Sequence, residues 1–285
     1  MKAGLLIPTR NAGTVFAELL EQINTQSYPL SRKVIIDTSS EDQTVAIARA
    51  HGFEVMRIAK DEFNHGGTRQ QAYDEIRKDL DIVLCLTQDV ILYDKDSIRQ
   101  LVDAFHDASV GAAYGRQIPK KGADIEECLQ RSFNYPGKSR LKSLSDRDAL
   151  GIKAPFLSDT FSAYRCTALD CVGGFPDDVP ANEDMYVGAK LLLQGYKIAY
   201  VAEAAVYHSH QYSCRAMFER YYQTGRFQRQ QYWIVDTFGK SEGAGMRLLL
   251  YQLRVIAREC PSALPVYFMH MCIKYMAYRL GWLKG

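Results

Sequence analysis

The sequence predicts an α/β fold in which a mostly parallel, Rossmann-like central sheet is flanked by helices and followed by a helical extension. Three observations support this. Short β-branched, apolar runs alternate with polar, helix-like stretches through the first half of the chain, which is the pattern of βαβ units. Polar side chains directly follow several of these runs. The final 40 residues are basic, rich in large apolar side chains and interrupted by prolines.

The individual elements follow from that alternation. Val15, Leu19 and Ile23 recur at helical spacing, so they predict one apolar helix face between the first two strands. The other boundaries come from the same change of period. In chain order, we expect strands at 3–8, 33–37, 54–58 and 82–87, helices at 14–26, 43–51 and 68–78, a strand within 153–166 and a helix at 185–194.

The composition excludes several classes of protein. The chain has 285 residues, 47% hydrophobic and 24% charged, which indicates a globular protein rather than a disordered or low-complexity one. Lys and Arg number 35 against 33 Asp and Glu, and this balance does not suit a nucleic-acid partner. Seven cysteines without a CxxC pair, and the lack of a signal-peptide core near the N-terminus, predict a reduced, cytoplasmic protein.

Positive charge is concentrated near the C-terminus. Residues 246–285 carry six Lys or Arg and a single acid, Glu259. We expect basic amphipathic helices broken at Pro261 and Pro265, which either pack on the domain with a solvated basic face or lie on an anionic membrane surface. We therefore divide the chain into residues 1–215 and a helical extension, 216–285, through which a homodimer could also form.

Polar residues stand where the expected strands end, which is where open parallel sheets bind their ligands. These ends are Pro8–Asn11, Asp37–Ser40 and Gln88–Asp89. Asp37 could accept a hydrogen bond from a nucleobase or a ribose hydroxyl, whereas the following serines are more simply turn or cap residues. The sequence contains neither GxGxxG nor GxxxxGK[ST], so a nucleotide would be held without those phosphate loops.

Two further motifs have both a structural and a functional interpretation. Asp89 is a turn residue or a ligand for a hard cation that bridges a diphosphate. The segment from Asn64 to Arg69 contains His65, Gly66 and Gly67, which predict a glycine turn leading into a helix. Its free backbone N–H groups, with Arg69 in the first helical turn, would form an anion-binding nest.

In their order and spacing, these motifs resemble family 2 of the inverting glycosyltransferases, which have the GT-A fold. The resemblance covers roughly residues 1–210. Within the family, the segment from Asn64 to Arg69 is similar to the branch that transfers L-rhamnose from dTDP-rhamnose during polysaccharide assembly. The matching segments are Ile7-Pro8-Thr9-Arg10-Asn11, Ile36-Asp37-Thr38-Ser39-Ser40-Glu41-Asp42, Thr87-Gln88-Asp89, Gly173-Gly174-Phe175 and Asn182-Glu183-Asp184.

The resemblance implies roles for particular residues. Asp37 would bind the base, and Asp89 would hold Mg²⁺ or Mn²⁺ bridged to the donor pyrophosphate. Thr87 stands where the family has the first acid of its Asp-x-Asp motif, which predicts a site that takes more of its ligands from the nucleotide. The residues implied to bind the nucleotide sugar are Pro8, Thr9, Arg10, Asn11, Asp37, Ser39, His65, Gly66, Arg69, Gln88 and Asp89.

A second metal ligand and a base are implied in the same way. In the family, a residue beyond the acceptor region closes the metal site, which implies His208 with His210 as the alternate, although single histidines are more often structural. Inverting transfer needs one positioned base and no covalent nucleophile. The resemblance implies Asp184 for that role and Glu183 as the residue that orients it. The alternative is that Asn182 and the two acids merely cap the following helix.

Several other side chains keep two interpretations. Asp159 would contact a sugar or be a loop acid; Tyr114 is more simply a core residue, and Phe133 and Tyr135 are open between the core and a sugar ring. Arg226 lies in a segment similar to the Gln-x-x-Arg-Trp motif of processive members and would contact the pyrophosphate. A solvated basic loop is the default for Arg131, Lys138, Arg140 and Lys142, with anionic lipid or phosphate as the alternative.

The resemblance further implies a lipid-linked polysaccharide or O-antigen-type acceptor, and hence a peripheral position on the inner face of the cell membrane. Because the Gln-x-x-Arg-Trp motif is imperfect, single or short-repeat addition is expected rather than a long polymer. Three alternatives are a UDP-sugar donor, a non-catalytic glycan-assembly partner and a sugar nucleotidyltransferase. The last would need a glycine-rich phosphate loop after the first strand, which Pro8–Asn11 does not provide.

Overall fold

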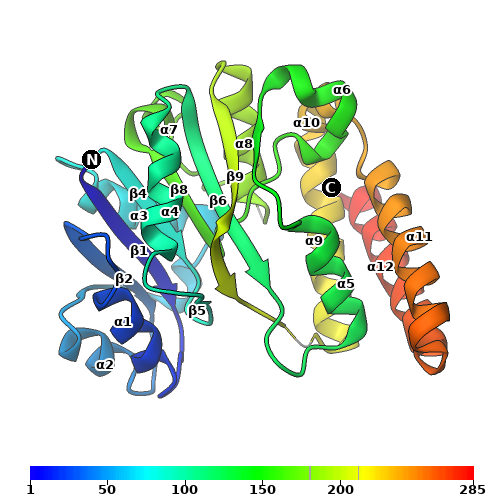
Figure 1. The fold of residues 1–285 in the computed structure, drawn as a ribbon, viewed down its shortest axis with the longest axis horizontal. Helices are drawn as coiled ribbons and strands as arrows, with labels where there is room; N and C mark the ends of the chain where they lie inside the picture. Colours follow the sequence, from blue (N-terminus) through cyan, green and yellow to red (C-terminus); the bar gives the residue numbers. More distant parts are fainter. Residues whose placement is uncertain (180, 211) are drawn as a thin grey trace.

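The computed structural model describes residues 1–179, 181–210 and 212–285, which form a nine-stranded sheet with helices on both faces (Figure 1). The strand order is β3-β2-β1-β4-β8-β6-β9-β5, and β7 pairs with β9. The strands are β1 (Ala3–Thr9), β2 (Arg32–Thr38), β3 (Glu54–Ile58), β4 (Ile82–Leu86), β5 (Ile91–Leu92), β6 (Val110–Ile118), β7 (Arg140–Lys142), β8 (Phe161–Arg165) and β9 (Lys197–Tyr207).

The four predicted N-terminal strands are present and parallel. β1 lies between β2 and β4, and β2 pairs with β3. This half of the sheet follows from short buried runs separated by helices, as the βαβ pattern predicts. The α-helices of the chain are α1 (Phe16–Asn24), α2 (Thr44–Ala50), α3 (His65–Ile76), α4 (Ser97–Asp103), α5 (Ile125–Asn134), α6 (Arg147–Leu150), α7 (Cys166–Cys171), α8 (Glu183–Leu193), α9 (Cys214–Gln230), α10 (Tyr232–Phe238), α11 (Ser241–Glu259) and α12 (Leu264–Lys284).

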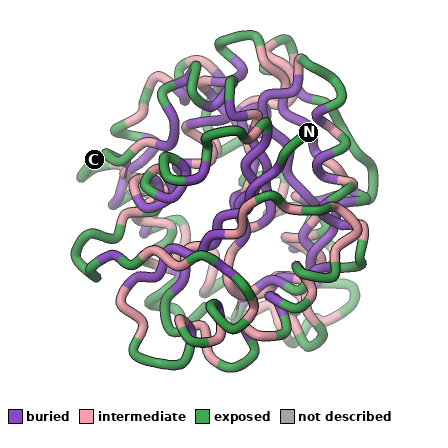
Figure 2. Tube along the Cα trace, turned by 90° about the vertical axis from the view of Figure 1, so that its left-hand side faces the viewer, coloured by how far each residue is buried: buried purple, intermediate pink, exposed green. Residues whose placement is uncertain are grey.

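Side chains of β1 alternate between two hydrophobic layers. Leu5 packs on the face covered by α1, α2 and α4, and Leu6 on the face covered by α3, α7 and α8. Buried residues accordingly run along the central strands, and exposed residues follow the outer loops and helices (Figure 2). This three-layer arrangement confirms the predicted fold class.

The second half of the sheet changes direction. β8, which lies within the expected range 153–166, is antiparallel to both β4 and β6, whereas β6 and β9 are parallel. β6 therefore brings residues near 117 beside the end of β9. This pairing of β6 with β9 supplies part of the candidate site, and the local sequence pattern does not predict the pairing.

The C-terminal helices gather at one side of the sheet, next to α5 (Figure 1). α12 packs along α9, where Gly225 and Gly281 let the two backbones meet, since a Cβ on either would collide with a carbonyl of the facing helix. The chain breaks between α11 and α12 at Pro261, as expected, whereas Pro265 lies within the first turn of α12. Among the described residues, every helix is too short or too polar to span a bilayer.

Candidate active site

The loops after β1 and β2 are joined by side chain to backbone hydrogen bonds. Asn11 accepts from the Glu41 amide and donates its own amide to Ser40 Oγ. Asn11 and Ser39 both adopt positive φ, 44° and 49°, which sharply turns the chain at each strand end. These bonds join the two loops into one rim at the expected nucleotide side of the sheet, and Arg10 is exposed beside them.

Asp37 lies beneath that rim and is wholly buried. Its carboxylate accepts from Thr9 Oγ1 at 3.1 Å and from the Ser40 amide at 2.9 Å. Thr9 and Asp37 face each other across the parallel β1–β2 pair, which explains the first bond. Asp37 therefore anchors the loops through its bonds with Thr9 and Ser40. Its role in base binding stays a prediction.

Gln88 has a structural partner. Its side-chain oxygen accepts from the Arg10 amide at 2.8 Å, and its nitrogen donates to the Arg10 carbonyl at 3.1 Å. Both ends of the amide are therefore used to tie the β4 end to the β1 end. The Gln88 side chain therefore has a structural role in this segment.

Asp89 meets both histidines that follow β9. Oδ2 of Asp89 lies 3.2 Å from His208 Nε2 and 3.7 Å from His210 Nδ1. One ligand atom from each of the three residues lies within 4.8 Å of the others, which is a spacing able to surround a metal ion. The histidine rings meet edge to face at a centroid distance of 4.3 Å. The structure thus brings together Asp89, His208 and the alternate, His210.

The protonation of this cluster suits a cation. Burial lowers the pKa of His208 more than its contact with Asp89 raises it, and burial together with His208 lowers the pKa of His210 to about 4. Although burial opposes ionisation of Asp89, its close contact with His208 keeps the pKa of that carboxyl below its usual range. Near neutral pH, the cluster therefore consists of one carboxylate and two neutral imidazoles, which are metal-ligating forms.

Gln117 and Arg131 both contact His208 Nδ1. The amide nitrogen of Gln117 donates to Tyr135 Oη at 2.8 Å and to Ser158 Oγ at 3.0 Å, and its oxygen lies 3.0 Å from Nδ1 and favours a proton there. Arg131 Nη2, which can only donate, lies 3.3 Å from the same nitrogen. In the tautomer with the proton on Nδ1, which Gln117 favours, the Nε2 lone pair faces a carboxylate oxygen and is buried without a hydrogen-bond partner among the described residues. Two electron-rich atoms face each other favourably when a cation lies between them. The residues present therefore fit a divalent metal.

Arg131 supports the same cluster. It donates to Gln117 Oε1 and lies 3.3 Å from Glu127 Oε1, which in turn accepts from the His210 amide. The default expectation of a solvated loop is therefore wrong for Arg131. It is also wrong for Lys142, which is buried and donates to the Phe156 carbonyl. Both residues belong to the folded interior because β7 and α5 lie against the sheet.

The segment from Asn64 to Arg69 differs from its prediction. α3 begins at His65, and the side chain of Asn64 accepts from the amides of Gly66 and Gly67, both at 3.0 Å. The expected turn with free N–H groups is therefore wrong, because the helix supplies its own cap. Gly66 is required for another reason, since a Cβ there would collide with the Pro176 carbonyl.

Arg69 neutralises buried acids. Its guanidinium lies 2.8 Å from Glu183 and 3.2 Å from Asp159, and all three side chains are at least nine-tenths buried. Asp159 also accepts from Ser162 and Tyr164, so it is neither a free loop acid nor an exposed sugar contact. In this structure Arg69 faces carboxylates inside the protein rather than an open anion site.

Asp184 differs from its neighbour Glu183. It is partly exposed, and among the described residues its oxygens accept from two backbone amides, those of Met185 at 2.7 Å and Asp159 at 3.4 Å. Burial of the carboxyl group and the charges of Glu183 and Asp159 raise the pKa of Asp184 well above its usual value. Asn182, at the helix start, makes no side-chain cap bond, so the simple capping interpretation does not hold for it.

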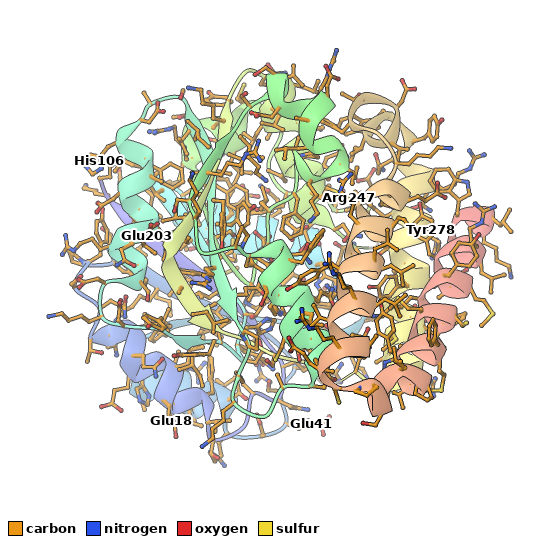
Figure 3. The ribbon with its side chains drawn as sticks, turned by 45° about the vertical axis from the view of Figure 1, so that its right-hand side comes forward. Glu18, Glu41, His106, Glu203, Arg247 and Tyr278 are labelled. Carbon is orange, nitrogen blue, oxygen red and sulfur yellow. The ribbon has the colours of Figure 1, made fainter. Side chains whose placement is uncertain are left out.

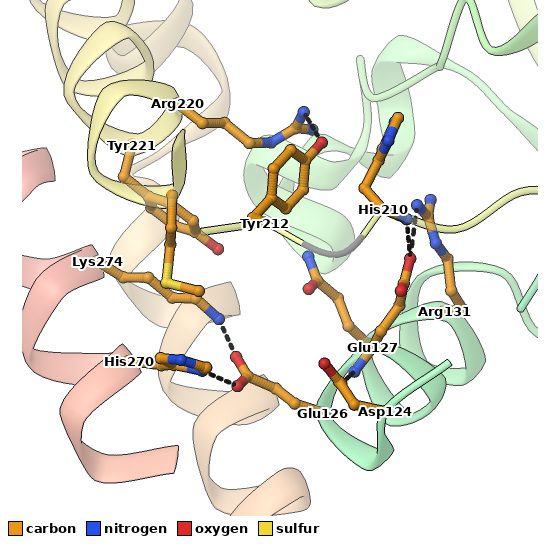
Figure 4. Close-up of a pocket in the computed structure, with 12 residues that line it drawn as sticks. Asp124, Glu126, Glu127, Arg131, His210, Tyr212, Arg220, Tyr221, His270 and Lys274 are labelled. Atoms are coloured by element: carbon orange, nitrogen blue, oxygen red, sulfur yellow. Dashed lines mark hydrogen bonds and ion pairs between the residues drawn. The ribbon is translucent and has the colours of Figure 1, made fainter. Parts of the chain in front are cut away.

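A cavity of about 100 Å³ opens beside His210 between α5, α9 and α12 (Figure 4). Glu126 on its wall binds His270 and Lys274 of α12, while Arg220 donates to Tyr212 Oη at 2.9 Å. The sequence contains no motif that points to Arg220. Arg226, which lies in the segment similar to the Gln-x-x-Arg-Trp motif, has its backbone against Gly281 and Gly285 near the far end of α12.

The structure shows the surroundings of the aromatic residues whose role the sequence left undecided. Tyr114 and Tyr135 are core residues in mutual edge contact, as expected for Tyr114. Phe133 stacks on Tyr251 of α11 at a centroid distance of 5.7 Å. Tyr135 nevertheless has a site role, because its hydroxyl orients Gln117.

Known solved structures share this fold. The mannosyltransferase PcManGT from Pyrobaculum calidifontis, solved in complex with GDP-Man and Mn²⁺, superposes with a TM-score of 0.61 at 17% identity, over 99% of this chain and 83% of that one. At this identity the likeness concerns the fold alone, and it confirms the GT-A architecture.

Sequence relatives cover nearly the whole chain. The O-antigen chain rhamnosyltransferase RfbN of Salmonella typhimurium strain LT2 is 39% identical over 282 residues, which are 99% of this chain and 90% of the relative. The O-antigen chain rhamnosyltransferase WbaN of Salmonella anatum is 38% identical over 278 residues, 97% and 88% of the two chains. Residues 5–173 also match the family model described as glycosyl transferase family 2. On these grounds and on its fold, the chain belongs to glycosyltransferase family 2 and is a glycosyltransferase.

Proposed function

We propose that the protein is an inverting, metal-dependent rhamnosyltransferase that transfers L-rhamnose from dTDP-L-rhamnose to a lipid-linked O-antigen-type glycan. The donor sugar and the acceptor class are supported by the two relatives, both named as O-antigen chain rhamnosyltransferases. We place the reaction at the inner face of the cell membrane, where the lipid of such an acceptor would lie. A homodimer stays a prediction.

Metal dependence rests on one observation: His208 Nε2, which has no hydrogen-bond partner among the described residues, lies 3.2 Å from the Asp89 carboxylate. Asp89, His208 and His210 would hold the ion. When bound, a divalent cation would neutralise the charge that develops on the departing dTDP. Two imidazoles among three protein ligands suit Mn²⁺ better than Mg²⁺, which prefers oxygen ligands.

The loops after β1 and β2 would hold the nucleotide. Pro8, Thr9, Arg10 and Asn11 form one side of the rim, and Ser39 lies on the other. Arg10 is exposed there and offers its charge to the phosphates or ribose. Asp37 would act from beneath, by positioning Ser40 or by accepting a hydrogen bond from the base.

In the proposed transfer, the acceptor oxygen attacks the anomeric carbon as the bond between that carbon and the diphosphate oxygen breaks. The bonding electrons leave with dTDP, and Asp184 takes the proton of the acceptor hydroxyl. Asp184 suits this task because it is accessible, has no cationic partner within hydrogen-bonding distance among the described residues, and has a raised pKa. Glu183 and Arg69 hold the start of α8 in place.

Calorimetric titration of the full chain with dTDP, UDP, GDP and CMP, each with Mn²⁺, Mg²⁺ or neither, tests the donor. We expect selective dTDP binding that is tightest with Mn²⁺, followed by release of dTDP from dTDP-rhamnose when a glycan acceptor is present. A preference for UDP would retain the mechanism and reject the donor. Absence of nucleotide binding would favour the non-catalytic alternative.

A further inference from the structure

Helix α12 carries apolar side chains on both of its faces. Its inward side buries Tyr267, Ala277 and Gly281, and it also carries His270 and Lys274, which bind Glu126 of α5 (Figure 4). An ordinary surface helix has one apolar face and turns a polar face to solvent. The outward face of α12 consists of Val266, Phe268, Met269, Cys272, Tyr275, Met276, Leu280 and Leu283, together with Arg279.

This outward face is strongly exposed. Tyr275 is 64% and Leu283 73% accessible, and ten of the nineteen exposed large hydrophobic residues in the described part of the chain lie on α11 and α12. Scattered exposed apolar side chains are ordinary, but a contiguous stripe along a helix of 21 residues, roughly 30 Å in length, marks an interaction surface.

Basic side chains border the stripe. Arg279 and Lys284 lie on α12 itself, and Arg247, Arg254 and Arg258 are exposed on the adjoining α11. Figure 3 shows Arg247 and Tyr278 on the side of the C-terminal helices, with the acidic Glu18 on the opposite side of the molecule. The exposed acids of the two helices are Glu242, which lies 3.8 Å from Arg279, and Glu259.

We propose that the outward face of α12 docks on an anionic lipid bilayer, with the helix lying in the headgroup plane. Apolar side chains would enter the acyl boundary while the bordering Arg and Lys contact anionic headgroups. Neither α11 nor α12 can cross the bilayer, so the contact is peripheral.

The charge pattern favours lipid over a second copy of the chain. A two-fold contact through α12 would place the same basic border of both copies in one interface, where like charges repel. An anionic surface removes that cost, and it requires no complementary protein surface. The stripe is also nearly uninterrupted by polar groups, as a lipid contact needs.

Docking would fix the position of the candidate active site relative to the bilayer. The inward face of α12 lines the cavity that opens beside His210, so one helix lies between the bilayer and the metal cluster. On the proposed function, a glycan carried on a membrane lipid would then reach this cavity without leaving the headgroup region. This consequence depends on the proposed function, whereas the docking itself does not.

Vesicle flotation of the full chain tests the docking. We expect binding to phosphatidylcholine vesicles that contain phosphatidylglycerol and little binding to phosphatidylcholine alone. The triple variant Phe268→Ser, Tyr275→Ser, Leu283→Ser should weaken binding at least about tenfold, because it removes apolar area from the contact. The matched control Val15→Ser, Tyr93→Ser changes exposed apolar residues elsewhere and should bind as the parent does.

A charge variant gives an independent test if the triple variant folds poorly. Arg279→Gln with Lys284→Gln should weaken binding to anionic vesicles about fivefold per charge removed. Unchanged binding in a folded triple variant, or in this charge variant, would overturn the proposal. So would a parent chain that is dimeric by light scattering and becomes monomeric in the triple variant without binding vesicles.

Transferase assays on a water-soluble acceptor separate the two proposals. The triple variant should keep parental turnover there, because its changed residues face away from the cavity. If the parent shows no turnover with any nucleotide sugar yet floats with anionic vesicles, the proposed function fails and the docking stands.

Discussion

Two carboxylate clusters in this molecule balance their charge in opposite ways. Asp89 faces two histidines that are neutral near neutral pH, and His208 Nε2 has no hydrogen-bond partner in the described part of the chain. Glu183 and Asp159 face Arg69, a permanent cation within the fold. Arg69 is part of the fold and stabilises its cluster with or without a ligand, whereas Asp89 and its two neutral imidazoles gain a cation only when metal is present. Buried acids alone therefore do not identify a metal site; the charge state of their partners does.

The largest expected effect comes from Asp184, which belongs to the second cluster but lacks its arginine. Asp184→Asn should lower turnover about 10²- to 10⁴-fold, the usual contribution of a general base. Donor affinity, measured by calorimetry, should stay unchanged because, in the proposed mechanism, Asp184 acts on the acceptor hydroxyl. Retained turnover would reject Asp184 as the base.

The pH profile sharpens this prediction. Since the base must be deprotonated, activity falls as pH drops through the pKa of Asp184, and burial together with Glu183 and Asp159 raises that pKa. The acid limb of kcat/KM should therefore lie above the range of an ordinary carboxyl group. An acid limb near pH 4 would contradict the environment described for Asp184.

Removing the internal cation should mainly affect stability. Arg69→Met leaves Glu183 and Asp159 buried without their partner and should cost about 3–5 kcal/mol in urea unfolding. Glu183→Gln in the same background should recover part of the loss. By contrast, His208→Ala in the metal-free protein should cost far less, because no fixed ion pair is broken. Equal losses in the two clusters would remove the distinction between them.

A smaller effect is expected from Gln117, which orients His208 without touching the metal. Gln117→Leu should weaken Mn²⁺ binding about 10- to 100-fold, as for other residues that orient a metal ligand. Electron paramagnetic resonance of free Mn²⁺ measures this directly. The matched control is Gln88→Leu, which alters the Thr87-Gln88-Asp89 segment at a side chain that bonds to Arg10 and should therefore keep Mn²⁺ affinity.

The sequence was most informative where chemistry and local structure coincide. The strands ending near Asp37 and Asp89 were predictable because short apolar runs end in polar residues. His208 and His210 were both named, and the structure brings both to Asp89. The resemblance supplied the family, which the relatives confirm.

Other parts of the site had no local signal. Gln117 and Arg131 reach His208 because β6 runs beside β9 and α5 lies nearby, and these pairings join residues far apart in the chain. Arg220 and Arg226 lie on one helix, and only the three-dimensional packing shows that the first lines the cavity. The glycines after Asn64 predict a turn by type, but the cap bonds of Asn64 allow a helix there.

That cap gives the smallest predicted effect. Asn64→Ala removes the acceptor for two helix amides and should cost about 1 kcal/mol of unfolding free energy, as N-cap losses usually do. Ser213→Ala, which removes the cap of α9, is a matched control of similar size. Because the Gly66 and Gly67 amides bind Asn64 rather than a ligand, nucleotide affinity should stay constant. Reduced nucleotide affinity with unchanged stability would mean that this segment binds the donor, and the built-in cap would then have to open when the donor enters.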